Sequence, residues 1–255
     1  MNSVAKRAVR AAITSAGIAY EGFRKLRSLI YWRLQWAIRV VFGSAVDERR
    51  FKRRDRAFVR SSFTNVNLPH RAWLADRLMA DVHIQDVLEV GCGWGANLEV
   101  LAHRFKSLRV TGVDISPESI AEGAIRLASN GLDQVRLLRA TADDLTAFGD
   151  GAFDVVFTDA VLLYVGPDKI ERSIREMLRV TRCQLVMLEL HQIGFGALGR
   201  YTRDGWVRDY ASLMQRVLPG ETVEVTPLPP EARPAGRWPQ RGALVKVSLP
   251  EAARK

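Results

Sequence analysis

Cysteine and long apolar runs are what this sequence of 255 residues has least of. The two cysteines, Cys92 and Cys183, have no C-x-x-C partner, which argues against a disulfide framework or a zinc site and favours a reducing compartment. No uncharged apolar stretch approaches about 18 residues, so no transmembrane helix is expected. Lys6, Arg7 and Arg10 precede an alanine-rich stretch without a clear cleavage signal, so export is not expected. We expect a cytoplasmic protein without a metal site and leave membrane association open.

Acidic residues are scarce in the first part of the chain. Residues 1–60 hold 15 Lys and Arg against 4 Asp and Glu, whereas the rest of the chain is close to neutral. The net charge of +10 therefore belongs to an N-terminal extension. We predict a basic helical extension over residues 1–60 and a main domain over residues 61–255, because this length suits one domain with an appendage.

Apolar residues in the extension recur at steps of three and four, which predicts an amphipathic helix over residues 1–46. The stripe consists of Phe23, Leu26, Ile30, Leu34, Ala37 and Val41, with Tyr31, Trp32 and Trp36 beside it. A basic helix with such aromatics can lie on an anionic membrane, or it can pack on its own domain or on a second subunit. The basic cluster that follows, residues 47–56, can contact phosphates of lipid or nucleic acid or stay solvated.

Apolar runs alternate with helical patterns after residue 80. This alternation predicts an α/β fold with a mostly parallel, doubly wound sheet. Expected strands are Asp86–Val90, Leu108–Val113, Val135–Leu138, Phe153–Phe157, Gln184–Leu190, Glu221–Thr226 and Ala243–Leu249. Expected helices cover His70–Met79, Asn97–Phe105, a segment starting after Ser116, and Ile170–Val180. In such a sheet the cofactor lies at the carboxyl edge, where the strand order reverses.

The most informative segment joins the first of these strands to the next helix. Residues 89–95 read Glu-Val-Gly-Cys-Gly-Trp-Gly, and alternating glycines let a backbone turn tightly and lie against a ligand. The helix that follows offers free N–H groups, which favour nucleotide-like ligands. Asp114 ends the next strand, where an acid can accept hydrogen bonds from both hydroxyls of a ribose. We therefore predict a cofactor that contains adenosine.

Spacing and charge decide among such cofactors. A dinucleotide fingerprint needs a glycine three residues after Gly93, where this chain has Ala96. The carboxylate of Glu89 repels a pyrophosphate and attracts a cation, and S-adenosylmethionine carries a sulfonium and an ammonium group. In this segment the chain resembles the class I S-adenosylmethionine-dependent methyltransferases, whose first motif reads (Glu/Asp)-x-Gly-x-Gly-x-Gly.

The resemblance covers roughly residues 80–192. It implies S-adenosylmethionine as the cofactor and a Rossmann-like sheet of seven strands that ends in an antiparallel hairpin. Its implied cofactor contacts are Glu89, Gly91, Gly93 and Gly95 at the methionine part, Asp114 at the ribose, Ile115, Ala142 and Asp143 at the adenine, and Asp159 near the methyl group. Where the family has an aspartate, this chain has Thr141, so Asp143 is expected to contribute instead.

Two residues at strand ends are candidates for catalysis. Asp159 is expected to orient the substrate or touch the sulfonium side, the alternative being a structural acid in a salt bridge. His191 is a candidate general base for a hydroxyl acceptor, the alternative being a histidine that is merely hydrogen-bonded. Arg203 or Arg208 could hold an acidic or sugar substrate, or lie on an ordinary helix face.

The expected activity is methylation of an oxygen on a sugar or surface-glycan intermediate near a membrane. Residues 176–182 and the segment around Trp238 are similar to methyltransferases of bacterial polysaccharide pathways. The turn at residues 91–95 is also similar to that of cyclopropane fatty acid synthases, so a lipid-linked or RNA substrate stays open, as does a non-catalytic cofactor-binding scaffold. Expected partners are a small-molecule or glycan acceptor, a membrane surface contacted through residues 1–46, and a second subunit, with nucleic acid less favoured.

Overall fold

The computed structural model describes residues 30–31, 33–39, 43–47, 64–80, 84–202, 204–232 and 238–249. Its strands are β1 (Asp86–Val90), β2 (Arg109–Asp114), β3 (Arg136–Arg139), β4 (Phe153–Asp159), β5 (Thr181–Leu190), β6 (Arg200–Thr202), β7 (Gly205–Val207), β8 (Val223–Pro227) and β9 (Gly242–Ser248). Its helices are α4 (Pro69–Leu78), α5 (Ala96–Arg104), α6 (Pro117–Ser129), α7 (Ile170–Val180), α8 (Tyr210–Val217) and α9 (Trp238–Arg241), with two single 3-10 turns, η1 (Leu162–Tyr164) and η2 (Pro230–Ala232).

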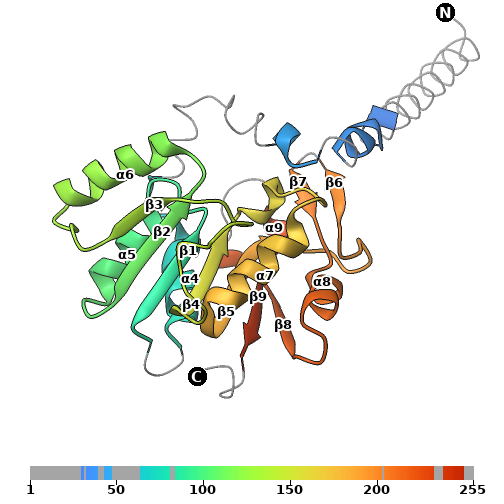
Figure 1. Cartoon of the computed structure of the whole chain (residues 1–255). Coiled ribbons are helices and arrows are strands. Elements are labelled where there is room, and N and C mark those ends of the chain that lie inside the picture. Colours follow the sequence, from blue (N-terminus) through green and yellow to red (C-terminus); the bar gives the residue numbers. More distant parts are fainter. Residues whose placement is uncertain are drawn as a thin grey trace, which may run out of the picture.

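Seven of the strands form one sheet in the order β3-β2-β1-β4-β5-β9-β8, and β6 pairs with β7 in a separate hairpin (Figure 1). Strands β1 to β5 run parallel to one another, whereas β9 is antiparallel to both β5 and β8. The strand order reverses between β1 and β4, because β2 and β3 lie on one side of β1 and β5 lies beyond β4. This Rossmann-like sheet with a terminal antiparallel pair confirms the expected fold class.

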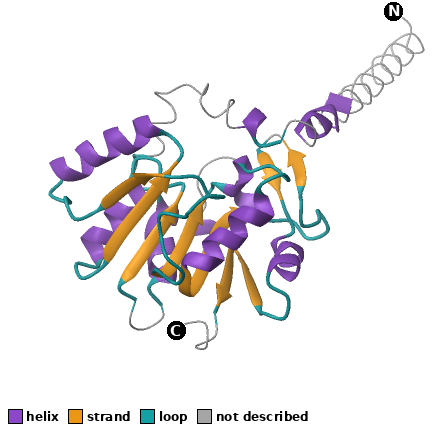
Figure 2. Ribbon diagram, viewed as in Figure 1, coloured by secondary structure: helices purple, strands orange, loops and turns teal. Residues whose placement is uncertain are grey.

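Helices cover both faces of the sheet (Figure 2). Successive residues of a strand point to opposite faces, and in β1 Val87 enters the core beneath α4 and α5 while Leu88 enters the core beneath α7 and α8. Both cores are clusters of buried, mostly aliphatic side chains, so the central strands are rich in apolar residues on both faces. Among the described residues, no helix has the length and apolarity needed to cross a bilayer.

The expected strands and helices are present, with ends that differ by a few residues. The β6–β7 hairpin and α8 are additions to the expected elements. The two strands of the hairpin have three residues each, which is too short to show an alternating pattern. The expected N-terminal helix over residues 1–46 needs a correction: a turn at Gly43 and Ser44 interrupts it, and Gly43 has a φ of 64°. Residues 1–29 and the expected domain boundary near residue 60 lie outside the described residues.

Residues 30–31, 33–39 and 43–47 are called the anchor segment below, and the end of this segment lies beside the β6–β7 hairpin (Figure 1). Arg39, Ser44 and Asp47 of this segment are buried, whereas Leu34 and Trp36 are exposed. The segment therefore packs on the main domain with one side and presents apolar groups on the other.

Close packing inside the sheet gives the first prediction. A Cβ at Gly112 of β2 would stand 2.5 Å from Leu98 Cδ1 and 2.7 Å from Cys92 Sγ, so Gly112→Ala should destabilise the fold by about 1–3 kcal/mol. Urea unfolding followed by circular dichroism measures this loss. The matched control is Gly149→Ala, because a Cβ at Gly149 meets no atom within 4 Å. Equal stability of the two variants would contradict the packing described here.

Candidate active site

The candidate site lies where β1 and β4 end side by side. Ligands of open α/β sheets bind at the carboxyl edge where the strand order reverses, and that reversal falls between these two strands. Glu89 is the fourth residue of β1, and Asp159 is the last residue of β4. The fold therefore brings two acidic side chains to the position at which a ligand is expected.

The turn after β1 forms an open backbone cradle. Gly91, Gly93 and Gly95 have φ values of 79°, 53° and 77°, a range that disfavours any residue with a Cβ. A Cβ at Gly91 would also stand 2.3 Å from Val161 Cγ2, so this glycine is needed for the close approach of the two loops. A Cβ at Gly93 would meet nothing within 4 Å, and this backbone is therefore free to approach a ligand.

Asp114 fixes the same turn from the neighbouring strand. Its carboxylate accepts hydrogen bonds from the backbone N–H of Gly93, at 2.9 Å, and of Ser116, at 2.8 Å. Burial raises the pKa of Asp114 although these bonds oppose the shift. Ile115 beside it is half-buried. The acid thus connects the glycine turn to the start of α6, as a ribose-binding acid at this edge would.

The segment after β3 reaches this edge as well. The backbone N–H of Ala140 donates to the carbonyl oxygen of Asp114 at 3.2 Å, which brings Ala142 and Asp143 next to the end of β2. Asp143 lies 3.7 Å from Lys169 Nζ. The structure therefore gathers the residues expected at the ribose and the adenine on one side of the turn.

Glu89 is almost completely buried, with 2% of its surface exposed. Its Oε1 accepts a hydrogen bond of 2.6 Å from Asn97 Nδ2, while its Oε2 has no partner among the described residues. Burial raises the pKa of Glu89 to about 8, and the charge of Asp159 contributes in the same direction. A buried, unpartnered carboxyl oxygen beside an open glycine turn fits a cationic ligand such as an ammonium group.

Asp159 lies in a network of polar side chains from two helices. His70 Nε2 lies 3.2 Å from its Oδ2, and Asn97 Nδ2 donates to the same oxygen at 3.0 Å. Arg71 Nη1 is 3.7 Å from this oxygen. Burial alone would raise the pKa of Asp159, but the hydrogen bond and charge of His70, together with Arg71, lower it to about 2. Asp159 is therefore ionised and held in place.

Sequence reasoning missed three members of this network. His70 and Arg71 come from α4 and Asn97 from α5, and the contact between His70 and Asp159 joins residues 89 apart in sequence. No local motif marks such a pair. Asn97 is the one member of the three with a local signal in the sequence, because it lies in the first turn of the helix that follows the glycine turn.

Glu189 of β5 shapes the other side of the edge. Its Oε1 accepts hydrogen bonds from the backbone N–H of Val161 and of Leu162, both at 3.0 Å, and from Thr158 Oγ1 at 2.9 Å. Burial raises the pKa of Glu189 to about 7. This carboxyl fixes the loop that follows β4, and through Val161 it fixes the contact of this loop with Gly91.

His191 and Arg208 have geometries that differ from their expected roles. The backbone N–H of Tyr210 donates to His191 Nδ1 at 3.2 Å, and burial lowers the pKa of His191. In the neutral ring Nε2 then carries the proton, so His191 offers a donor rather than the lone pair of a general base. Arg208 is fully buried and donates to the carbonyl oxygens of Leu162 and Val165, which corrects the expectation that it holds a substrate. Arg203 lies outside the described residues.

Comparison with known proteins identifies the family. A family model described as a methyltransferase domain matches residues 87–184. A phosphatidylethanolamine N-methyltransferase of Cereibacter sphaeroides is 34% identical over 157 residues, which cover 56% of this chain and 74% of that protein. The chain belongs to the S-adenosylmethionine-dependent methyltransferases. As a class I member it is an enzyme that uses S-adenosylmethionine, which confirms the expected family, the expected cofactor and methyl transfer as the reaction type.

Other similar proteins differ in what their names say they act on. A ubiquinone biosynthesis O-methyltransferase of Caulobacter vibrioides is 36% identical over 94 residues. These residues cover 36% of the present chain and 36% of the Caulobacter protein. The crystal structure of an Aquifex aeolicus methyltransferase has a TM-score of 0.52 at 16% identity, covering 74% of this chain and 97% of that one. The latter likeness concerns the fold alone.

The raised pKa of Glu89 predicts how the stability of the methyltransferase changes with pH. The folded state holds a proton on Glu89 up to about pH 8, whereas the unfolded chain loses it near 4.5, so the free energy of unfolding should fall as the pH rises through this window. Glu89→Gln should flatten the decline, because the amide does not titrate. Urea unfolding across the window measures both slopes. Glu231→Gln, at an exposed site, is the control, and an unchanged slope in Glu89→Gln would refute the assignment.

Proposed function

We propose that this methyltransferase transfers the methyl group of S-adenosylmethionine to the polar headgroup of a lipid-borne acceptor at an anionic membrane surface. The observation that carries the proposal is the anchor segment. It presents an exposed apolar face while it is bonded to the loops that follow β4 and β5, at the edge where the acceptor must enter. The protein would work on the cytoplasmic side, where Cys92 and Cys183 stay free thiols as they are in this structure.

The exposed apolar face consists of Ile30, Tyr31, Leu34 and Trp36, and is called the outer face below. Their exposed fractions are 58%, 50%, 56% and 43%, which is unusual for large apolar side chains. Arg33 is exposed among them, and residues 1–60 carry an excess of basic over acidic side chains. Aliphatic and aromatic groups on a basic helix suit the interface of an anionic bilayer.

The cofactor contacts expected from the sequence agree with this geometry and form part of the proposal. Glu89 would hold the ammonium group through its unpartnered Oε2, and the glycine turn would lie along the methionine part. Asp114 would bind the ribose, with Ile115, Ala142 and Asp143 at the adenine. Asp159 would border the methyl group. The bound cofactor supplies an activated methyl group, and the protein positions the acceptor and excludes water.

An amine headgroup is the first acceptor to test. The relative from Cereibacter sphaeroides is named a phosphatidylethanolamine N-methyltransferase, and its likeness extends over more than half of this chain. His191 Nδ1 already accepts a hydrogen bond, so this histidine does not provide a general base. An amine that enters the site uncharged can accept the methyl group without one. The ionised Asp159 at the edge also favours a basic acceptor over an acidic one.

O-methylation of a sugar or surface-glycan intermediate is the second candidate. His191 favours it in a different role, because its Nε2–H can donate a hydrogen bond to a hydroxyl of the acceptor. A lipid-linked glycan would meet the same membrane-facing entrance. The two candidates therefore differ in the acceptor atom and share the site.

The ribose assignment predicts a loss of cofactor affinity. Asp114→Ala removes a charged acceptor of the kind that contributes about 1.5–3 kcal/mol, so the Kd for S-adenosylmethionine should rise by at least tenfold. Isothermal titration calorimetry measures the change. Asp133→Ala replaces an exposed acid that follows α6 and should bind like the unchanged protein. An Asp114→Ala protein with full affinity would overturn the assignment.

The lipid acceptor predicts methyl transfer to vesicles. Vesicles of phosphatidylethanolamine and phosphatidylglycerol with methyl-labelled S-adenosylmethionine should yield labelled lipid, whereas soluble sugars should not. The double variant Ile30→Ser and Leu34→Ser should reduce vesicle binding by about tenfold or more, because two apolar side chains no longer enter the interface. Lipid extraction with chromatography and vesicle sedimentation give the two readouts.

The matched control is Ile125→Ser, which removes an apolar group that is 70% exposed on α6. It should leave vesicle binding unchanged. The membrane proposal would be overturned if the unchanged protein did not bind vesicles but had a dimeric mass in light scattering, and if the double variant were monomeric. That result would show that a second subunit covers the outer face. Label in a sugar or glycan, with none in lipid, would favour the second candidate.

A further inference from the structure

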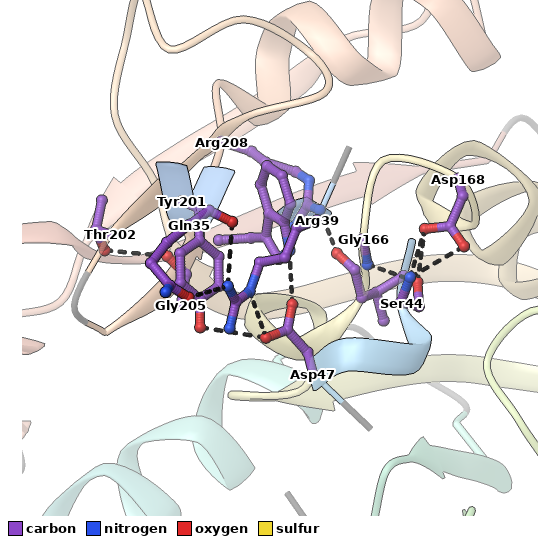
Figure 3. A network of polar contacts seen from close by, with 12 residues as sticks. Gln35, Arg39, Ser44, Asp47, Gly166, Asp168, Tyr201, Thr202, Gly205 and Arg208 are labelled. Atoms are coloured by element: carbon purple, nitrogen blue, oxygen red, sulfur yellow. Dashed lines mark hydrogen bonds and ion pairs between the residues drawn. The ribbon is translucent and has the colours of Figure 1, made fainter. Parts of the chain in front are cut away.

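The anchor segment ends in a buried carboxylate that holds the β6–β7 hairpin (Figure 3). Asp47 accepts hydrogen bonds from Arg39 Nε at 2.7 Å, Tyr201 Oη at 3.2 Å and Trp206 Nε1 at 3.1 Å. The guanidinium of Arg39 also stacks on the ring of Tyr201, 3.7 Å from its centroid. Trp206 is completely buried. One acid of the N-terminal extension thus binds both strands of a hairpin more than 150 residues away.

Ser44 of the same segment binds the loop that follows β4 and η1. Its backbone N–H donates to Asp168 Oδ1 at 2.9 Å, and its hydroxyl donates to the same oxygen at 2.8 Å. The hydroxyl oxygen accepts from the backbone N–H of Gly166 at 2.8 Å. Figure 3 shows these bonds beside those of Asp47. The segment therefore bonds to the hairpin and the loop at the same time.

The hairpin and the loop are joined a second time by Arg208. Its guanidinium is fully buried and donates to the carbonyl oxygens of Leu162, at 2.7 Å, and of Val165. The loop in turn touches the cofactor turn, because Val161 leaves no room for a Cβ at Gly91. The anchor segment is thus the outermost part of a continuous set of contacts that ends at the site.

We propose that Asp47 and Ser44 are positioning residues of the acceptor side of the site. They hold the hairpin and the loop after β4 from outside the sheet, and they fix the outer face relative to the acceptor entrance. This inference rests on the proposed function for the place of the acceptor. It assigns the N-terminal extension a part in acceptor turnover and none in cofactor binding, because the contacts of Glu89 and Asp114 come from other elements.

The test compares Asp47→Asn and Ser44→Ala in the full chain. Asp47→Asn keeps the shape but turns an amide toward the N–H of Trp206, and Ser44→Ala removes the hydroxyl's two bonds while the backbone bond stays. Hydrogen exchange should become about fivefold faster or more over residues 160–168 in Ser44→Ala, as the loss of one hydrogen bond implies, and over the hairpin in Asp47→Asn. The Kd for S-adenosylmethionine should stay within about twofold by calorimetry.

Kinetics on phosphatidylethanolamine vesicles separate positioning from a general loss of structure. The KM for the lipid should rise or kcat should fall, while the KM for the cofactor stays the same. Ser44→Thr, which restores the hydroxyl, should rescue the activity. Ser129→Ala is the control, since that serine is exposed at the end of α6 and its hydroxyl donates to the carbonyl oxygen of Ile125 in the same helix.

Unchanged exchange over residues 160–168 in Ser44→Ala would overturn the inference. A loss of cofactor affinity parallel to the loss of turnover would also overturn it. Exchange and calorimetry need no acceptor, so they test whether Ser44 and Asp47 hold the loop and the hairpin independently of cofactor binding, even if no vesicle lipid is methylated, a result that would overturn the proposed function. The Ser44→Ala arm remains decisive if Asp47→Asn does not fold.

Discussion

Two acids, Glu89 and Asp159, are buried at the edge where β1 and β4 end, and the structure around them compensates for this burial. Two neighbouring acids in a low-dielectric site do not both ionise without compensation. Burial raises the pKa of Glu89 to about 8, whereas His70 and Arg71 overcome the burial of Asp159 and lower its pKa to about 2. Asn97 donates to both acids. The sheet alone cannot supply these partners, so α4 and α5 must dock where they do.

This division of charge also explains the choice of cofactor. Glu89 has an unpartnered carboxyl oxygen and a raised pKa, and a cation that approaches it favours the ionised form. The turn between Gly91 and Gly95 supplies space for such a ligand but no charge selection of its own. In the proposed site Glu89 is therefore the group that responds to the charge of the ligand, and the glycines determine how closely a ligand can approach it.

Local patterns predicted the parts of this site that are local in sequence. The bounds of β1 are predicted to the residue, since a mostly apolar run leads into glycines, and the acid near the end of β1 and those that end β2 and β4 can be named from their positions. His70, Arg71 and the bonds of Asp47 to the hairpin cannot, because their partners lie between 26 and 159 residues away and depend on how the elements dock. The basic extension was read as either membrane-binding or packed, and the described residues show a packed side and an exposed side on one helix.

The cofactor side and the acceptor side of the proposed site are built from different elements, and the family model covers only the first of them. The proposed cofactor half depends on strands β1 to β4 and on the turns between them, and the family model matches residues 87–184, which contain these strands except for Asp86 at the start of β1. The proposed acceptor half depends on Arg208, the β6–β7 hairpin and the anchor segment, all of which lie outside that match. A change at Asp47 or Ser44 can therefore alter the acceptor side while the backbone cradle at Gly91 and the acid at Asp114 stay as they are.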